Sequence, residues 1–320
     1  MSQELYIQNG GKLFAPVVES TITLDWERSG VPGKLSFDVV CDGKTRIAEG
    51  DPVAFKVSGK PMFYGFIFGR KYGKGETAQV TAYDQLRYLK NKDTYIYANK
   101  TAAELLRIIA RDFRLQLGTV ENTGYKIPRR VESDVALVDI IQNALDETLT
   151  NRKQMYVLYD DYGKLCLRNI AGMRQNLLID SESGESLSYG VDIDHATYNR
   201  IKLAVEDEEK GKREVYIAQD GANINKWGVL QYFEKIQGGV NAQAKANALL
   251  SLHNHSARSL SINGVFGHTG VRGGSLVAVS LRLEDGLQVN HYMVVERVKH
   301  CFNGGTHTMD LALRGGDFIV

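Results

Sequence analysis

The chain has 320 residues, of which 43% are hydrophobic and 24% are charged, as in an ordinary soluble globular protein of about two or three domains. Its 39 Lys and Arg residues balance 38 Asp and Glu residues, which excludes a long-range field that would attract nucleic acid or an anionic membrane. The three dispersed cysteines exclude a disulfide framework, and no run approaches the ~18 apolar residues of a membrane span, so we expect a protein that is made in the cytoplasm and leaves it only within a larger particle.

The first 90 residues alternate between apolar and polar side chains, which predicts short strands. Ile22, Leu24 and Trp26 point to one face of such a strand, and the pattern returns from Leu35 to Val39 after a glycine turn. Further strands are predicted over residues 53–57, 62–68 and 78–82. A small antiparallel barrel or a sandwich would hide the edges of these strands, so we expect residues 1–90 to form a first β-barrel.

The period changes to that of helices in residues 91–185, which predicts a compact α+β insert. Thr101 and Glu104 form a capping box, the pattern that satisfies the free amides at a helix start. A second helix is predicted to open at Asp134 and to bury Leu137, Ile141, Ala144 and Leu145. A hairpin over residues 155–168 then completes two helices and a hairpin.

Strands return in residues 186–320, which we predict to form a second β-barrel interrupted by one helix. The helix is expected at about 241–253, with Ala244, Ala248 and Leu252 on a small-residue face that lies close to a sheet. The fold class is therefore α+β and dominated by β-structure, with two antiparallel barrel modules that flank the insert.

One strand pattern occurs twice in the chain, which suggests that the two β-modules are related. The first copy runs through Gly50 to Phe55, a hairpin, Met62 to Arg70, a glycine-rich turn at Gly73 to Gly75, and Ala78 to Ala82. The second copy runs through Gly274 to Val279, a hairpin at Asp285–Gly286, His291 to Val298, a turn at Asn303 to Gly305, and His307 to Leu313. Each match alone is weak, and the order of the elements supports the duplication.

Two short motifs invite a chemical interpretation and favour a structural one. His253 and His255 form an H-x-H pair, but residues two apart on a helix diverge, and a zinc site needs three or four converging ligands. Gly69, Gly73 and Lys74 superficially resemble a phosphate loop, yet the spacing differs from the Walker pattern and the segment lies between two strands. We expect a helix terminus and a hairpin turn.

Other reactive side chains give no catalytic constellation either. Nothing near Cys41 predicts a lowered thiol pKa that would let it pair with His195. Asp160 with Asp161, and Glu206 to Glu209, fall at predicted turns, where carboxylates are solvated and keep ordinary acidity. The basic residues are dispersed among acids, as on a solvated face. We therefore expect no catalytic, cofactor-binding or metal-binding residue.

Several segments of the sequence resemble the baseplate hub family of contractile phage tails, within the late control gene D or tail hub superfamily. These segments are Val80 to Leu89, Thr101 to Glu104, Tyr156 to Leu165, Tyr198 to Lys202 and His307 to Leu311. The nearest branch is that of the hubs of PBSX-like prophages and phage-tail-like bacteriocins. The resemblance covers nearly the whole chain, and its motifs are structural rather than catalytic.

This resemblance implies a homotrimer in which each chain contributes two tube-like β-barrels. Six barrels would stack under a hexameric tail tube or tube-initiator protein and present threefold symmetry to the central spike. Other baseplate proteins and the tape measure are further implied partners, whereas membrane anchoring, sequence-specific nucleic acid and cofactors are not implied. The chain would be made in the bacterial cytoplasm and assembled into the baseplate of a tail or tail-like particle.

Two alternatives to the structural hub stay open at this point. A cell-wall hydrolase at the tip of the particle would need a cleft with converging acids and a perturbed pKa, and would release peptidoglycan. A glycan-binding or nucleic-acid-binding β-module would need an exposed aromatic platform, and phosphate contacts would make its affinity fall with added salt.

Overall fold

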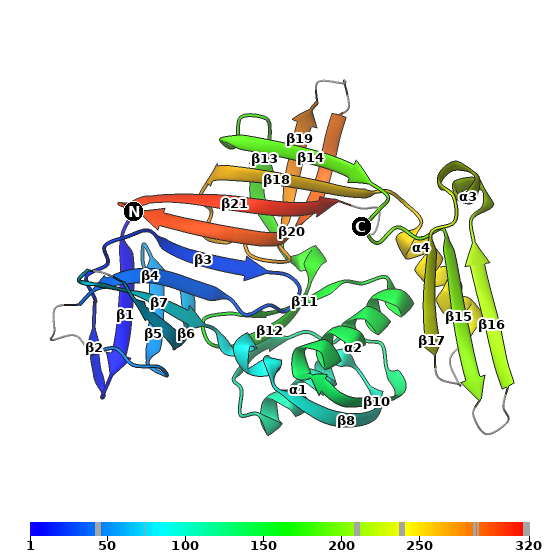
Figure 1. The fold of residues 1–320 in the computed structure, drawn as a ribbon, viewed down its shortest axis with the longest axis horizontal. Coiled ribbons are helices and arrows are strands. Elements are labelled where there is room, and N and C mark those ends of the chain that lie inside the picture. The colour runs from blue at the N-terminus through cyan, green and yellow to red at the C-terminus, as the bar shows by residue number, and fades with distance from the viewer. Residues whose placement is uncertain are drawn as a thin grey trace.

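One sheet of 13 strands runs through both ends of the chain (Figure 1). The structure, a computed structural model, describes residues 1–41, 46–73, 75–207, 212–236, 241–283, 286 and 288–315. Along the sheet the strand order is β14, β18, β21, β20, β3, β4, β7, β6, β5, β1 and β2, and β13 joins through β19, which pairs with β20. The strands are β1 (Gln3–Asn9), β2 (Lys12–Phe14), β3 (Ile22–Glu27), β4 (Lys34–Val40), β5 (Pro52–Val57), β6 (Lys60–Tyr72), β7 (Thr77–Tyr83), β13 (Arg174–Ile179), β14 (Ser186–Asp192), β18 (Ala257–Phe266), β19 (Leu276–Arg282), β20 (Gln288–Asn303) and β21 (Thr306–Gly315).

The predicted duplication is confirmed strand by strand. The order β5-β6-β7-β4-β3 in the first half matches β19-β20-β21-β18-β14 in the second, and the long middle strand carries a bulge in both. The Gly50 amide donates to the Ile67 carbonyl at 2.7 Å, and the Gly274 amide donates to the Val295 carbonyl at 2.7 Å. Both glycines have a left-handed backbone, with φ of 89° and 88°, which only glycine adopts readily. The two modules therefore share one backbone design.

The two modules are continuous with each other rather than closed into separate barrels, which corrects that part of the prediction. Strand β3 of the first module pairs with β20 of the second, with Trp26 opposite Val298 and Ile22 opposite Phe302. A single hydrophobic core lies across both modules. Pairing between modules satisfies the edge of β3 as closure would have done. The β-dominated α+β class with two related modules is confirmed.

The insert between the modules packs two helices against short strands and has its own core. Its elements are the 3₁₀ helix η1 (Gln85–Lys90), β8 (Lys92–Lys100), α1 (Ala102–Asp112), β9 (Leu117–Val120), β10 (Ile127–Ala136), α2 (Leu137–Arg152), β11 (Tyr156–Asp160), β12 (Leu165–Asn169) and the 3₁₀ helix η2 (Ile170–Gly172). The capping box is present: the Glu104 amide donates to Thr101 Oγ1 at 3.2 Å, and the Thr101 amide donates to the Glu104 carboxylate at 2.8 Å. No helix in the described ranges is both long and apolar enough to cross a membrane.

Helix α2 begins later than the sequence pattern predicts. Asp134 does not open the helix, because it belongs to β10 and has a left-handed backbone with φ of 55°, where the register with β8 shifts. Residues up to Ala136 stay extended because they pair with β8, so the helix begins at Leu137. Its predicted apolar face is confirmed, because Leu137, Ile141, Ala144 and Leu145 are all buried.

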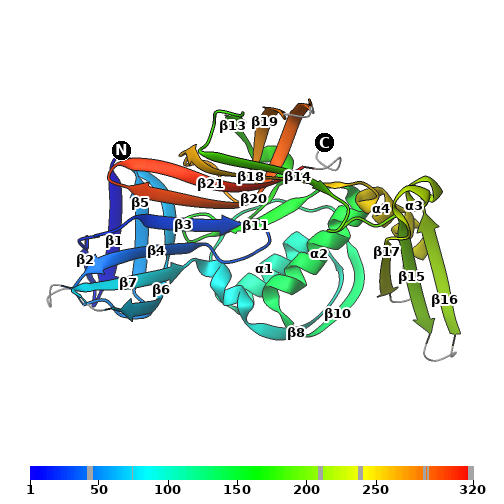
Figure 2. The same cartoon turned by 45° about the horizontal axis from the view of Figure 1, so that its top comes forward.

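A small three-stranded unit stands apart from the large sheet (Figures 1 and 2). It consists of β15 (Arg200–Asp207), β16 (Lys212–Gln219), α3 (Gly221–Trp227), β17 (Gln231–Ile236) and α4 (Ala242–His253). The strands over residues 198–219, which the sequence pattern places in the second barrel, thus form a sheet of their own with a separate core. Helix α3 is an additional helix that the sequence pattern does not indicate.

The buried face of α4 also differs from the prediction. Ala242, Ala246 and Leu249 are buried against β15 and β16, whereas Ala244 is exposed. Alanine occurs on both sides of this helix, so the apolar period fits either face equally well. The core of the small unit selects the face that carries Leu249.

Candidate functional site

A buried polar junction connects the first module, the insert and the second module. The Asp84 carboxylate follows β7 and accepts hydrogen bonds from the Gly33 amide at 2.9 Å and the Leu86 amide at 3.0 Å. Asp160, at the end of β11, accepts from the Gly163 amide at 2.7 Å. Arg272, just before β19, donates to the Asp160 carbonyl at 2.9 Å. The junction therefore lies where three parts of the chain meet.

Burial changes the acidity of both carboxyl groups. It raises the pKa of Asp84 well above its ordinary value, and the nearby Asp160 carboxylate raises it further. Burial likewise raises the pKa of Asp160 to about 6. The prediction that Asp160 is a solvated turn residue is wrong, because the hairpin tip folds inward and Gln85 Nε2 reaches its carboxylate at 3.4 Å. Asp161 beside it is largely exposed and pairs with Arg272 at 3.4 Å.

The geometry gives this junction a structural role. Both oxygens of Asp84 are engaged by backbone amides, so the carboxyl group fixes the turns at Gly33 and Leu86. The Arg272 guanidinium lies 4.4 Å from the ring centre of Tyr159 and 4.9 Å from that of Trp26, a cation sandwiched between the insert and β3. Asp84 and Asp160 therefore hold nearby turns in place, because their carboxylates accept hydrogen bonds from backbone amides of the protein itself.

A second buried polar pair lies in the second module. His300 Nε2 is 3.0 Å from the Val271 carbonyl, which can only accept, so this nitrogen carries the proton. His300 Nδ1 then accepts from His307 Nε2 at 2.9 Å. Burial lowers the pKa of His300 to about 3 and that of His307 to about 4. Both imidazoles are therefore neutral in the folded protein near pH 7.

We predict that His307 and Asp160 make the stability of the chain depend on pH in opposite directions. Unfolded His307 gains a proton near pH 6.5 and the folded one near pH 4, so its contribution to stability is present above pH 6.5 and is lost as the pH falls towards 4. Between pH 7 and 4.5, the stability deficit of His307→Gln relative to wild type should shrink by about 2 kcal/mol. Urea unfolding at both pH values measures it.

Asp160→Asn is the matched variant with the opposite sign. The folded pKa of Asp160 is raised, so its favourable contribution is complete below pH 3.8 and is lost as the pH rises through about 6. The free energy of unfolding of this variant, relative to that of wild type, should therefore be highest at pH 7 and should decrease as the pH falls. Parallel pH slopes for the two variants would contradict the assignment of the shifts.

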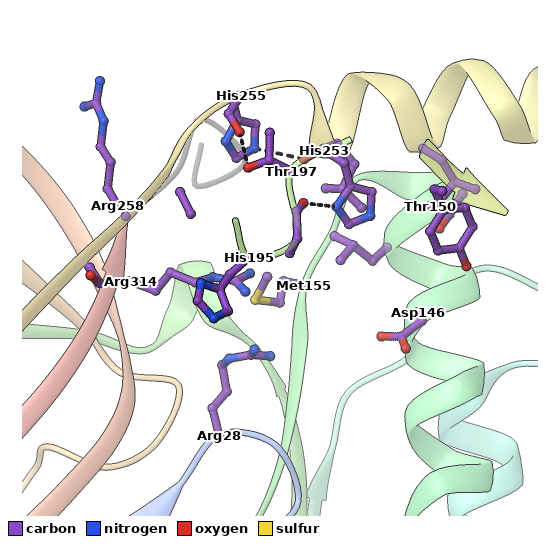
Figure 3. Close-up of a pocket in the computed structure, with 18 of the residues that line it drawn as sticks. Arg28, Asp146, Thr150, Met155, His195, Thr197, His253, His255, Arg258 and Arg314 are labelled. Carbon is purple, nitrogen blue, oxygen red and sulfur yellow. Dashed lines mark hydrogen bonds between the residues drawn. The ribbon is translucent and has the colours of Figure 1, made fainter. Parts of the chain in front are cut away.

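A cavity of about 610 Å³ lies where the small unit, α2 and the large sheet meet (Figure 3). Figure 3 shows Arg28, Arg314 and Asp146 approaching this space from β3's end, β21 and α2. Glu296 accepts from Arg28 Nε at 2.9 Å and lies 3.4 Å from Arg314 Nε. Aliphatic residues such as Leu149 and Met155 line the cavity together with polar and aromatic ones such as Thr150 and Tyr232.

The two histidines of the H-x-H pair line this cavity without forming a metal centre. His253 Nδ1 lies 3.0 Å from the Ala196 carbonyl, and burial lowers the pKa of its ring. His255 Nε2 lies 2.9 Å from the Leu252 carbonyl in the last turn of α4, as expected for a histidine at a helix C-terminus. Across the described ranges, no three His, Cys, Asp or Glu side chains group as metal ligands.

The other positions considered in the sequence do not come together in the structure. Cys41 lines a cavity with Arg46 and Arg70, whereas His195 lines the cavity of Figure 3 with Arg28. The glycine-rich turn joins the paired strands β6 and β7, which confirms a hairpin, and its Lys74 lies outside the described residues. Glu208 and Glu209 lie outside them as well, as do the side chains of Glu206 and Asp207.

Open strand edges are the other candidate for function. Strand β14 ends the path of the large sheet, and its Leu187 and Val191 are 36% and 51% exposed. Tyr72, at the end of β6, is 61% exposed. Unpaired edges with apolar side chains mark places where another chain can add. The sequence pattern indicates the first part of β6, from Met62 to Arg70, but it does not indicate β14 or which edges stay open.

Comparison with known proteins agrees with this architecture. The family model described as YQBQ-like matches residues 22–314. The phage-like element PBSX protein XkdQ of Bacillus subtilis strain 168 is 30% identical over 320 residues, covering 96% of this chain and 95% of XkdQ.

Solved structures share the fold at low sequence identity. The tail protein from Neisseria meningitidis MC58 superposes with a TM-score of 0.69 at 12% identity, over 99% of this chain and 98% of that one. The Escherichia coli c3393 protein superposes with a TM-score of 0.56 at 11% identity, over 98% of this chain and 78% of that one. It is described as a component of the type VI secretion system with structural similarity to the phage T4 tail proteins gp27 and gp5.

Proposed function

Because this chain belongs to the YQBQ-like family, we propose that it is a structural hub in the baseplate of a contractile tail or tail-like particle. In this role three copies form a ring that joins a sixfold tail tube to a threefold central spike. The observation that carries the proposal is the duplicated module: one chain holds two copies of the same five-strand order within a single sheet. Three such chains supply six related modules, which matches threefold to sixfold symmetry.

The partners follow from the two symmetries of this ring. The tail tube or tube-initiator protein would contact the six modules, the spike would contact the threefold side, and other baseplate proteins and the tape measure would meet the periphery or the centre. The chain would act in three parts, with modules in residues 1–90 and 186–320 and an insert in residues 91–185, of which β13 joins the large sheet, while the small unit of β15 to α4 stands apart from it. The PBSX origin of the relative and the tail-protein fold support this setting.

We propose further that the polypeptide has no enzymatic activity. A hydrolase of the kind considered above needs a carboxyl group with free hydrogen-bonding capacity in a cleft. Asp84 and Asp160 have the raised pKa of such a group, yet they are buried and engaged by backbone amides. Asp84 and Asp160 thus support a role in fixing the three parts of the chain. Asp146, whose pKa burial also raises, lines the cavity of Figure 3 and accepts from Gln142 Nε2 at 2.9 Å.

The oligomeric mass tests the proposed function. Light scattering of the purified chain should give three times the 35.6-kDa mass of one copy, and negative-stain images should show a ring with six lobes. A dilution series separates a stable trimer from a weak one. The proposal fails if the chain has the mass of one copy at every concentration and also after mixing with the tube and spike proteins of the same particle.

A further inference from the structure

The internal duplication assigns an equivalent in the second module to each residue of β3. Leu24 lies opposite Leu35, Leu35 opposite Ala82, and Ala82 opposite Ile67. In the second module Tyr189 lies opposite Leu260, Leu260 opposite Leu313, and Leu313 opposite Val295. Ile67 and Val295 make the same hydrogen bond to Gly50 and Gly274. Tyr189 of β14 is therefore the equivalent of Leu24 of β3.

The same register makes Leu187 the equivalent of Ile22 and Val191 the equivalent of Trp26. These equivalents have opposite environments. Ile22 and Trp26 are 3% and 8% exposed, on a strand that pairs with β20 and faces the shared core. Leu187 and Val191 are 36% and 51% exposed, because β14 ends the path of the sheet. Among the described residues, no strand takes the place beside β14 that β20 takes beside β3.

Strand β6 is the first-module equivalent of β20 and has the matching stretch open. β5 pairs with β6 between Lys60 and Phe66, while β7 takes the other side, so within the described residues Gly69 to Gly73 has an open edge on the β5 side. In the second module, β19 stops at the equivalent place and β3 continues the edge of β20 from Arg297 to Phe302. We call that pairing the intrachain seam.

We propose that β14 of one copy pairs antiparallel with Gly69 to Gly73 of β6 in a second copy, which we call the interchain seam. The register of the intrachain seam carries over: Val191 lies opposite Arg70 and Tyr189 opposite Tyr72, as Trp26 lies opposite Val298 and Leu24 opposite His300. This pairing rests on the proposed trimer and names the strands that hold it. It covers Val191 and repeats one contact around the ring.

Charge complementarity supports a second copy as the occupant. From Gln175 to Asn199 the sequence has five acidic residues and no Lys or Arg. They are Asp180, Glu182, Glu185, Asp192 and Asp194. The open end of β6 carries Arg70 and Lys71 instead. The intrachain seam likewise joins an acidic strand to a basic one, although through other positions: Arg297, whose equivalent on β6 is Gly69, donates from Nη2 to Asp25 at 2.8 Å, and its Nε lies 3.7 Å from Glu27.

The two seams differ in the polarity of the side chains that β20 and β6 contribute to them. In the intrachain seam β20 contributes Val298, His300 and Phe302, all buried. In the interchain seam β6 contributes Arg70 and Tyr72 at the first two of these positions, and Arg70 already pairs with Glu49 at 2.9 Å. The interchain seam thus buries less apolar surface and more charge, so it is the weaker of the two.

Disulfide trapping tests the proposed register. Val191→Cys with Arg70→Cys, in a Cys41→Ser background that removes the exposed native thiol, should oxidise to covalent dimers and trimers on a non-reducing gel. Trp26→Cys with Val298→Cys is the intrachain equivalent, and its oxidation yield without a change of mass sets the expected yield. Val191→Cys with Lys60→Cys, at the far end of β6, should give no ladder.

The outcomes separate the pairing from the proposed function. A trimeric wild type whose Val191–Arg70 pair stays uncrosslinked, while the intrachain pair oxidises, overturns the seam and leaves the hub intact. A wild type that never forms a trimer overturns both. Crosslinked trimers support both.

A charge variant gives a second, non-covalent test. Val191→Lys places a cation opposite Arg70, so the concentration for half-assembly should rise at least about tenfold. Val215→Lys is the matched control, because Val215 is 44% exposed on β16, outside either seam. Both variants should keep the thermal midpoint of the dissociated chain. Equal assembly by Val191→Lys and wild type would overturn the seam.

Discussion

Val277→Asp should abolish folding of the chain. Val277 is fully buried on β19, opposite Met293, in the core that both modules share. A carboxylate there finds no partner and loses its hydration, which costs more than about 4 kcal/mol and is a large part of the stability of a typical domain. The core is continuous across β3 and β20, so the loss should reach both modules rather than one.

Near-UV circular dichroism and gel filtration measure this outcome. We expect the variant to lose its tertiary signal and to elute as expanded or aggregated material. Ser280→Asp is the control, because Ser280 is exposed on the same strand and should tolerate the charge. A Val277→Asp chain with a native spectrum and wild-type assembly would show that this side of β19 is not core.

The second large effect concerns the paired glycines that open the two modules. Gly274→Ala should destabilise the chain by about 2–4 kcal/mol, because two costs add at this position. Its φ of 88° is strained for any side chain, and a Cβ there would lie 2.6 Å from Cγ2 of the buried Val157. Because Val157 belongs to the insert, the substitution also disturbs the contact between the insert and the second module.

Gly50→Ala separates the two costs. Gly50 has nearly the same backbone, with φ of 89°, but no atom lies within 4 Å of the position that a Cβ would take there. Only the backbone strain remains, so we expect a loss of about 1 kcal/mol. Urea denaturation of both variants measures the difference, and equal losses at Gly50 and Gly274 would mean that Val157 moves aside at no cost.

Much of the fold could be predicted because its signals are local. The capping box at Thr101 and Glu104 satisfies amides within one turn, and the strand patterns after Gly50 and Gly274 need only alternation and a left-handed glycine. The duplicated order of strands therefore appears in the sequence. Barrel closure depends instead on which distant strand reaches an edge, and no local pattern shows that β3 pairs with β20.

The polar junction shows the same limit for the candidate site. Asp160 has the neighbours of a solvated turn residue in sequence, and only the packing of Gln85 and Arg272 around it makes it a buried acid. Asp84 did offer one local signal, since an aspartate just before a helical stretch is a typical N-cap. That signal predicts the bond to Leu86 but not the bond to Gly33, which is 51 residues away.

The unequal polarity of the two seams bears on when a ring can form. The apolar intrachain seam forms at the high effective concentration that a single chain provides, so each copy folds with its two modules already joined. The interchain seam, with Arg70 and Tyr72 in place of Val298 and His300, has no such advantage and depends on the meeting of copies. In the proposed trimer the third interchain seam would close within one assembly, so closure would be cooperative and would have a threshold concentration. We would therefore expect separate copies at low concentration and rings only above that threshold.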